Sequence, residues 1–222
     1  MLWPMKVIVT CGPSYEPIDQ ARRITNFSTG RLGIALSNAF AARGWDVTCL
    51  RGEQATCVDP LRVRRVIPFS TNDDLAAKLA SLASEGGWHA VFHAAALCDY
   101  RVAGVTNEAG EVLASPKLSS RAGRLNLQLV PAAKVLPRLR EWYPAARLVG
   151  WKYELAGTRA EAFAKAWAQL AEAHVDACVL NGAAYGSGFA CCTPASVHSC
   201  ADADGLAAWL GRWLEATAQA KS

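Results

Sequence analysis

The chain has 222 residues, of which 52% are hydrophobic and 19% are charged. This composition argues against a disordered protein, and the length is enough to bury a substantial core, so we expect one domain over residues 1–222. The 23 basic and 19 acidic residues leave a net charge of +4. That excess is too small to indicate nucleic-acid binding but is compatible with an anionic small molecule as ligand.

The sequence contains no apolar run of about 18 residues, so we expect no membrane span. The first six residues, Met1–Lys6, are too short for the apolar segment of a signal peptide. We therefore expect a cytoplasmic protein whose eight cysteines are reduced thiols. The adjacent Cys191 and Cys192 lack His or Cys partners at ligand spacing, and we predict no metal site there.

Short β-rich runs alternate with helical runs along the chain. Strands are expected at Lys6–Cys11, Trp45–Leu50, Val63–Pro68, His89–Ala95, Leu148–Tyr153 and Asp176–Leu180. Helices are expected at Gly30–Arg43 and Asn72–Ser84, after the capping box of Thr158 and Glu161, and around Leu206–Leu214. This alternation predicts an α/β fold with a mostly parallel sheet and helices on both faces.

Ligands of such sheets bind beyond the carboxyl ends of the strands, and two loops at that edge are unusually long. Residues 12–28 separate the first strand from its helix, and residues 97–124 precede the extended run Leu125–Val130. Loops of this length in a compact domain are usually functional or flexible. We treat residues 97–124 as a flap.

The first candidate site is the start of the first helix, Ser28–Gly33. Gly30 and Gly33 allow close backbone approach there, the free N–H groups of the helix suit a phosphate, and Arg31 adds positive charge. The long loop brings Asn26 to the same place. The alternative is ordinary capping with close packing of the helix on the strand.

A short-chain dehydrogenase does not fit this pattern. Its glycine motif would follow the first strand directly, whereas about seventeen residues intervene here. Its Tyr-x-x-x-Lys pair is also missing, because the residues four positions after the tyrosines are Asp19, Gly104, Arg147, Gly157 and Phe189.

Three further candidates are weaker. Small residues Ala95 and Ala96 precede Asp99 at the end of the fourth strand, where a flat ligand or a simple turn fits equally. Lys117 in the flap suits a triphosphate, although most lysines are merely solvated. Asn181-Gly182 and Gly186–Phe189 form a glycine-rich turn after the last expected strand.

These segments together resemble phosphopantothenate–cysteine ligase (phosphopantothenoylcysteine synthetase), the C-terminal domain family of DNA/pantothenate metabolism flavoproteins, in its free-standing form. The resemblance rests on Thr10–Asp19, Arg23–Gly33, Ala95–Tyr100, Pro116–Leu118, Leu127–Val130, Val149–Glu154, Asn181 and Gly188-Phe189. It spans nearly the whole chain.

The resemblance implies a Rossmann-like three-layer α/β/α fold, a homodimer, and a ligase of coenzyme A biosynthesis. Such an enzyme activates the carboxylate of 4′-phosphopantothenate as an acyl-nucleotide with ATP or CTP and couples it to cysteine. It uses Mg²⁺ with the triphosphate and no flavin. The implied catalytic residues are Asn26 and Lys117. The implied substrate- and nucleotide-binding residues are Gly12, Ser14, Ser28, Thr29, Gly30, Arg31, Gly33, Ala95, Ala96, Asp99, Tyr100, Asn181 and Phe189.

The chain departs from the family pattern at several positions. Gly12-Pro13-Ser14 replaces two glycines and a threonine, Cys98 replaces an alanine, and Gly182 replaces an aspartate. Ser119 and Ser120 stand where bacterial fused forms carry lysines. The choice between ATP and CTP stays open. Two alternatives also stay open: an NAD(P)-dependent Rossmann-type reductase, for which Glu53 would bind the ribose, and a nucleotide-binding homologue that has lost catalysis.

Overall fold

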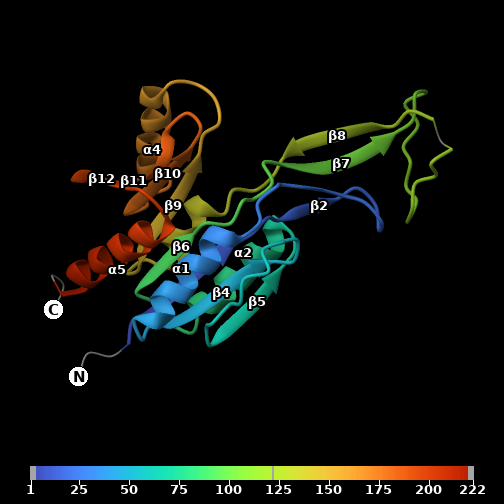
Figure 1. Ribbon diagram of the computed structural model, residues 1–222. Helices are drawn as coiled ribbons and strands as arrows, with labels where there is room; N and C mark the ends of the chain where they lie inside the picture. Colours follow the sequence, from blue (N-terminus) through green and yellow to red (C-terminus); the bar gives the residue numbers. More distant parts are fainter. Residues whose placement is uncertain (1–3, 122, 220–222) are drawn as a thin grey trace.

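The computed structural model describes residues 4–121 and 123–219, and its centre is an eight-stranded sheet (Figure 1). The strands follow the order β12-β11-β10-β9-β6-β1-β4-β5. Their bounds are Lys6–Cys11 (β1), Asp46–Gly52 (β4), Arg65–Phe69 (β5), Ala90–His93 (β6), Arg147–Tyr153 (β9), Ala177–Gly182 (β10), Gly186–Thr193 (β11) and Ser196–Cys200 (β12). Six neighbouring strands of this sheet are parallel: β10, β9, β6, β1, β4 and β5. The remaining two, β11 and β12, extend the sheet in antiparallel pairing at one edge.

Helices cover both faces of the sheet. On one face α1 (Arg31–Ala42) and α5 (Ala203–Gln219) pack on Val7, Val9 and Val149. On the other face α2 (Asn72–Ala83), the short η1 (Leu136–Arg138) and α3 (Leu139–Trp142), and α4 (Arg159–Glu172) cover Ile8, Val91 and Leu148. Successive residues of each central strand thus enter opposite cores, so these strands read as continuous apolar runs.

The order of strands creates a reversal point beside β1. The chain passes from β1 through α1 to β4 and β5 on one side, and then crosses through α2 to β6 on the other side of β1. The next sheet strand after β1 is β4 on one side, and the next sheet strand after β6 is β9 on the other side. The carboxyl edge at such a reversal point is where a ligand fits in this kind of sheet.

The three-layer fold and the six expected parallel strands are confirmed. The capping box of Thr158 and Glu161 is also present, with both reciprocal hydrogen bonds. The sequence interpretation missed β11 and β12, whose glycine-rich start looked like a turn. All eight cysteines carry free thiols and are buried. Among the described residues, no helix combines the length and the apolar character that crossing a membrane requires.

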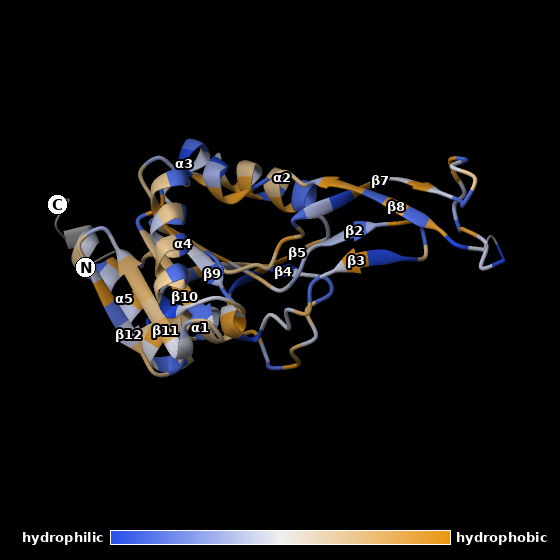
Figure 2. Cartoon of the chain, turned by 90° about the horizontal axis from the view of Figure 1, so that it is seen from above, coloured by the Kyte–Doolittle hydropathy of each residue, from blue (hydrophilic) through white to orange (hydrophobic). Residues whose placement is uncertain are grey.

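Two hairpins extend from the sheet instead of forming loops. The chain between β1 and α1 folds into β2 (Tyr15–Pro17) and β3 (Arg23–Thr25). The chain after β6 forms β7 (Tyr100–Thr106), which pairs with β8 (Asn126–Pro131). The expectation of a loop over 97–124 is thus wrong for β7, and the extended run near 125–130 is an arm strand outside the main sheet. The β7–β8 arm projects from the body, with the β2–β3 hairpin beside it (Figures 1 and 2).

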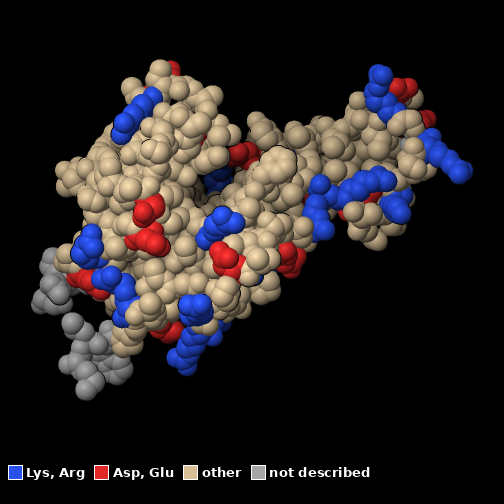
Figure 3. All heavy atoms as spheres, viewed as in Figure 1, with Lys and Arg blue, Asp and Glu red and all other residues tan. Residues whose placement is uncertain are grey.

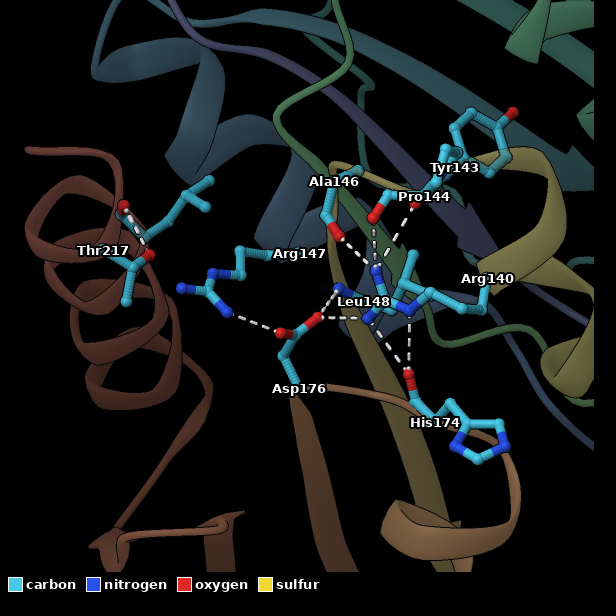
Figure 4. Close-up of polar contacts among 10 residues, drawn as sticks. Arg140, Tyr143, Pro144, Ala146, Arg147, Leu148, His174, Asp176 and Thr217 are labelled. Carbon is cyan, nitrogen blue, oxygen red and sulfur yellow. Dashed lines mark hydrogen bonds and ion pairs between the residues drawn. The ribbon is translucent and has the colours of Figure 1, made fainter. Parts of the chain in front are cut away.

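A half-buried carboxylate fixes the opposite, amino edge of the sheet (Figure 4). Asp176 accepts hydrogen bonds from the Leu148 backbone N–H at 2.8 Å, from Arg147 at 2.6 Å and from Arg140 at 2.7 Å. Burial opposes ionisation of Asp176, but these donors hold its pKa below the usual value. The bonds join the start of β9 to α3 and to the chain entering β10, so this cluster has a structural role.

The contact between α1 and β1 predicts a steric requirement at Gly33. A Cβ atom at this position would lie 2.2 Å from Cys11 Cβ. We expect Gly33→Ala to lower the free energy of unfolding by about 1–3 kcal/mol in urea denaturation. Gly104→Ala is the control, since its nearest heavy atom would be 3.8 Å away. Equal stability of the two variants would contradict the packing role.

Candidate active site

The loops after β1 and β6 continue to pair beyond the end of the sheet. The Ala96 backbone N–H donates to Gly12 O at 3.0 Å, and the Ser14 N–H donates to Ala96 O at 3.2 Å. Pro13 and Ala96 form an isolated parallel bridge between these bonds. The two loops therefore share one rigid backbone platform at the reversal point.

A buried hydrogen-bond network locks this platform to α2. The Ser14 hydroxyl donates to Asn72 Oδ1 at 2.7 Å and accepts from the Cys98 N–H at 2.8 Å. Asn72 Nδ2 in turn donates to Cys98 O at 2.8 Å. Ser14 and Asn72 are 0% and 3% exposed, so each loss of a partner would leave a buried polar group unsatisfied. Ser14, expected to bind substrate, thus has its hydroxyl committed to holding the loops.

Asn26 lies on this platform. Its Nδ2 donates to Ala96 O at 2.9 Å while the residue stays exposed. The preceding Thr25 donates its hydroxyl to Ser14 O at 2.7 Å, which fixes the backbone just before Asn26. The structure therefore brings together three predicted residues, Ser14, Asn26 and Ala96.

The start of α1 lies next to Asn26 along the chain and suits an anion. Gly30 is the N-cap residue in a left-handed conformation (φ 81°), and it supplies no side-chain hydrogen bond to the helix. The first turn contains no acidic residue, and Arg31 is exposed. Thr29 Oγ1 accepts a long bond of 3.3 Å from the Arg31 N–H. The helix N-terminus therefore presents partial positive charge toward solvent.

The glycines at this edge also have packing roles. Cβ atoms added to Gly12 and Gly30 would lie 2.7 and 3.1 Å from Ala55 Cβ, in the loop after β4. Gly33 packs on Cys11. Close packing of helix, strand and loop, the alternative that the sequence left open, is thus present at all three positions. The phosphate-binding role of these glycines stays a prediction.

A buried histidine, His93, is linked through Thr10 to the backbone of the platform. The His93 Nδ1 lies 2.9 Å from Thr10 Oγ1, which accepts a hydrogen bond of 3.1 Å from the Ala95 N–H. Burial lowers the pKa of His93 from 6.5 to about 4, so the imidazole is neutral at pH 7. The network positions the backbone of Ala95, a residue predicted to line the nucleotide pocket.

Asp99 and Tyr100 lie where the arm leaves the platform. Both are exposed, and the Asp99 carboxylate forms an ion pair with Lys134. The Asp99 backbone O accepts from the Ala132 N–H at 2.9 Å, which joins the two arm strands at their base. The Asp99 side chain therefore faces solvent beside the platform, with a cation already next to it. The visible face of the molecule is hollowed beside the base of the arm (Figure 3).

Lys117 is not near Asn26 in this chain. The segment 116–118 is bonded to the tip of the β2–β3 hairpin, through Gln20 N–H to Pro116 O at 2.9 Å. Asn26 follows β3 at the other end of that hairpin. The two predicted catalytic residues are thus held at opposite ends of one short hairpin.

Asn181 and Phe189 lie further along the edge, on β10 and β11. Neighbouring Leu180 pairs with Ala190, which places the two residues next to each other. Gly182 has φ 112°, and a Cβ there would lie 2.3 Å from Glu154 O. A side chain such as the aspartate that the resemblance implies at this position has no room on this backbone.

The sequence analysis missed Asn72, His93 and Lys134. Asn72 was only the expected start of a helix, and His93 stood inside an apolar strand. A polar residue in a run that reads as buried was the one available signal for His93. Among the described residues, no group of three His, Cys, Asp or Glu side chains is arranged to hold a metal ion.

The sequence matches a known protein family. Residues 2–204 match the family model of the DNA/pantothenate metabolism flavoprotein C-terminal domain. The chain belongs to this family. It is 31% identical over 176 residues to the coenzyme A biosynthesis bifunctional protein CoaBC of Thermococcus kodakarensis, covering 79% of this chain and 41% of that protein. The namesake protein of Mycobacterium tuberculosis is 31% identical over 185 residues, or 83% of this chain and 43% of that protein. The chain therefore spans less than half the length of these relatives.

Solved structures share the fold. The DNA/pantothenate metabolism flavoprotein of Streptococcus pneumoniae superposes with a TM-score of 0.84 at 22% identity, over 96% of this chain and 99% of that one. A Cab2 mutant in complex with phosphopantothenate-cysteine gives a TM-score of 0.72 at 18% identity, over 98% of this chain and 89% of that one.

The shifted pKa of His93 predicts a pH dependence of stability. The unfolded chain takes up a proton near pH 6.5 and the folded chain only near pH 4, so stability is complete above 6.5 and falls as the pH drops through this window. We expect wild type to lose on the order of 2 kcal/mol more than His93→Asn between pH 7 and pH 5, in urea denaturation. The exposed His198→Asn is the control and should show the wild-type loss. Parallel curves for wild type and His93→Asn would refute the assignment.

Proposed function

We propose that this chain is a phosphopantothenate–cysteine ligase. The observation that carries the proposal is the placement of Asn26 on the Ala96 platform, beside an α1 N-terminus without a side-chain cap, in a chain of this family. The carboxylate of 4′-phosphopantothenate attacks the α-phosphorus of ATP or CTP and releases pyrophosphate. The amine of cysteine then attacks the acyl-nucleotide, which gives the amide and a nucleoside monophosphate.

The chemistry explains why the site needs neutral and cationic donors. A carboxylate does not react with an amine at neutral pH, because oxide is a poor leaving group. The mixed anhydride with a nucleotide provides a good leaving group, the nucleoside monophosphate. The protein must therefore hold several anionic groups together and stabilise the charge that develops at phosphorus.

The α1 N-terminus, with Gly30 and Arg31, would bind a phosphate of one substrate, assisted by Ser28 and Thr29. Asn26 would contact the acyl-phosphate. An amide suits this contact because it donates a hydrogen bond and does not titrate. Its present partner, Ala96 O, keeps the amide oriented at the platform.

The nucleotide would lie along the rest of the same edge. Ala95, Ala96 and Asp99 would line its pocket, with Gly12 and Tyr100 nearby. Asn181 and Phe189 would close the far side. Mg²⁺ would arrive with the triphosphate, because such ions need only one or two carboxylates besides phosphate oxygens and water. Asp99 is an exposed carboxylate at this edge.

Lys117 would bind the triphosphate from the arm. Since the structure holds Lys117 away from Asn26 of the same chain, we propose a homodimer in which the arm serves the site of the second copy. The arm carries exposed apolar side chains that a second copy could cover: Leu127 and Leu129 on β8 are 39% and 44% exposed. Basic side chains gather on and below the arm (Figure 3).

A reductase is less well supported. The glycine motif of a dehydrogenase would follow the first strand directly, whereas β2 and β3 separate β1 from α1 here. Glu53, the proposed ribose ligand, lies 3.5 Å from the Tyr15 hydroxyl. A homologue without catalysis would be recognised by binding of the substrates with no release of pyrophosphate.

The role of Asn26 predicts a stalled second step. We expect Asn26→Ala to release pyrophosphate from ATP or CTP with phosphopantothenate, but to accumulate the acyl-nucleotide in place of amide, as detected by mass spectrometry. Asp204→Ala, at an exposed residue at the start of α5, is the control and should behave as wild type. Normal amide formation by Asn26→Ala would contradict its role, and no pyrophosphate from wild type would contradict the proposed function.

If the site is shared between two copies, a variant that loses the dimer should lose activity to the same extent. We expect Leu129→Glu to shift the chain from dimer to monomer in analytical ultracentrifugation, because a charge in a buried apolar contact is costly. Activity should fall with the dimer fraction. Val197→Glu on β12, which is 45% exposed, is the control. A monomeric wild type with full activity would rule out a shared site.

A further inference from the structure

The tip of the β2–β3 hairpin is hydrogen-bonded to the segment that carries Lys117. Hydrogen bonds reach this segment on both sides of the lysine. Gln20 N–H donates to Pro116 O at 2.9 Å, and Leu118 N–H donates to Asp19 Oδ2 at 3.1 Å. Arg22 Nη2 donates to Leu118 O at 3.1 Å. The backbone is therefore tied immediately before and immediately after Lys117.

Asp19 is the centre of this contact. Its side chain is 1% exposed, and besides Leu118 it accepts from the N–H groups of Ala21 and Arg22 at 2.8 and 2.7 Å. The Arg22 guanidinium adds an ion pair of 3.2 Å. Burial opposes ionisation, but the three backbone donors and Arg22 hold the pKa of Asp19 below its usual value. The carboxylate is thus charged at neutral pH and fully committed to bonds.

Two of the donors belong to the hairpin itself and one belongs to the distant segment, 99 residues along the chain. Arg22 joins them, because it contacts both Asp19 and Leu118 O. The Leu118 side chain is 4% exposed, so the contact also buries apolar surface. Lys117, between these anchored residues, is exposed.

We propose that Asp19 is a positioning residue that latches segment 116–118 to the hairpin and so presents the Lys117 ammonium to the triphosphate. This inference rests on the proposed ligase function, in which Lys117 contacts the triphosphate. Asp19 itself touches no substrate. It acts by fixing the backbone of a flexible cation, and a displacement of about 1 Å in such a group costs on the order of 100-fold in rate.

The latch also couples the arm to the platform. The hairpin that ends in Asp19 and Arg22 begins at Ser14 and returns to Asn26, with Tyr15 paired to Thr25 at its base. The same short element therefore sets the position of Asn26 at one end and of Lys117 at the other. A shift of the hairpin would move both residues together.

The first test is structural and independent of activity. Hydrogen exchange of the Leu118 and Gln20 amides should be slow in wild type and at least about tenfold faster in Asp19→Asn, because the charged acceptor is lost. Asp204→Asn, an exposed aspartate at the start of α5, is the control and should leave both amides protected. If Asp19→Asn does not fold, Leu118→Pro removes the N–H donor from the other side, and exchange is then followed at the Gln20 amide. Unchanged exchange would overturn the latch.

The second test shows whether the latch acts through Lys117. We expect Asp19→Asn to raise KM for the triphosphate and to lower kcat/KM by about tenfold or more, and Lys117→Gln to lower it about 100-fold. In the Lys117→Gln background, Asp19→Asn should have no further effect. Asp19→Glu, which keeps the charge, should recover part of the loss.

The outcomes separate the two proposals. Additive losses in the double variant would overturn positioning through Lys117, even if the exchange test succeeds. Faster exchange in Asp19→Asn together with an inactive wild type would uphold the latch as a contact and overturn the ligase function, and with it the reason for the latch.

Discussion

The hydroxyl of Ser14 is the contact on which the geometry of the site depends. It donates to Asn72 and accepts from Cys98, so one buried oxygen joins the loops after β1 and β6 to the start of α2. The Ser14 carbonyl then holds Thr25, which precedes Asn26. In a low-dielectric interior the two bonds of the Ser14 hydroxyl are expensive to break, so they hold the two loops in place. Two long connections therefore become one platform.

In the proposed reaction the body of the fold and the arm contribute different groups. The body supplies a preorganised edge: the N-terminus of α1, the amide of Asn26 and the backbone held by Thr10 and His93. The arm carries Lys117 as a separate element. Preorganised donors stabilise developing charge without rearranging during the reaction, whereas a cation on an arm is able to reach a large, charged substrate after it binds. The hairpin between Ser14 and Asn26 connects the two parts.

Much of this architecture was predictable from sequence, and the limits have physical causes. Lys6–Cys11 was recognised because a strand buried on both faces must be apolar at every position, and Thr158 with Glu161 because capping is a local interaction. Ser14 and Asn72 were out of reach as partners, since they are 58 residues apart and nothing local links them. The arm strand β7 was hidden for a similar reason: it pairs with β8 outside the main sheet, and its half-exposed residues lack a buried-strand pattern. The resemblance to the family identified Asn26 and Lys117, but not that one hairpin separates them.

The central claim is that the carboxylate of phosphopantothenate is activated by attack on the α-phosphorus of a nucleoside triphosphate. The most direct measurement supplies phosphopantothenate labelled with ¹⁸O in both carboxylate oxygens, together with cysteine and ATP or CTP, and follows the label by mass spectrometry. The account predicts one ¹⁸O atom in the nucleoside monophosphate for each amide formed, and none in pyrophosphate. Label in inorganic phosphate, or amide formed with no label in any phosphorus product, would contradict it.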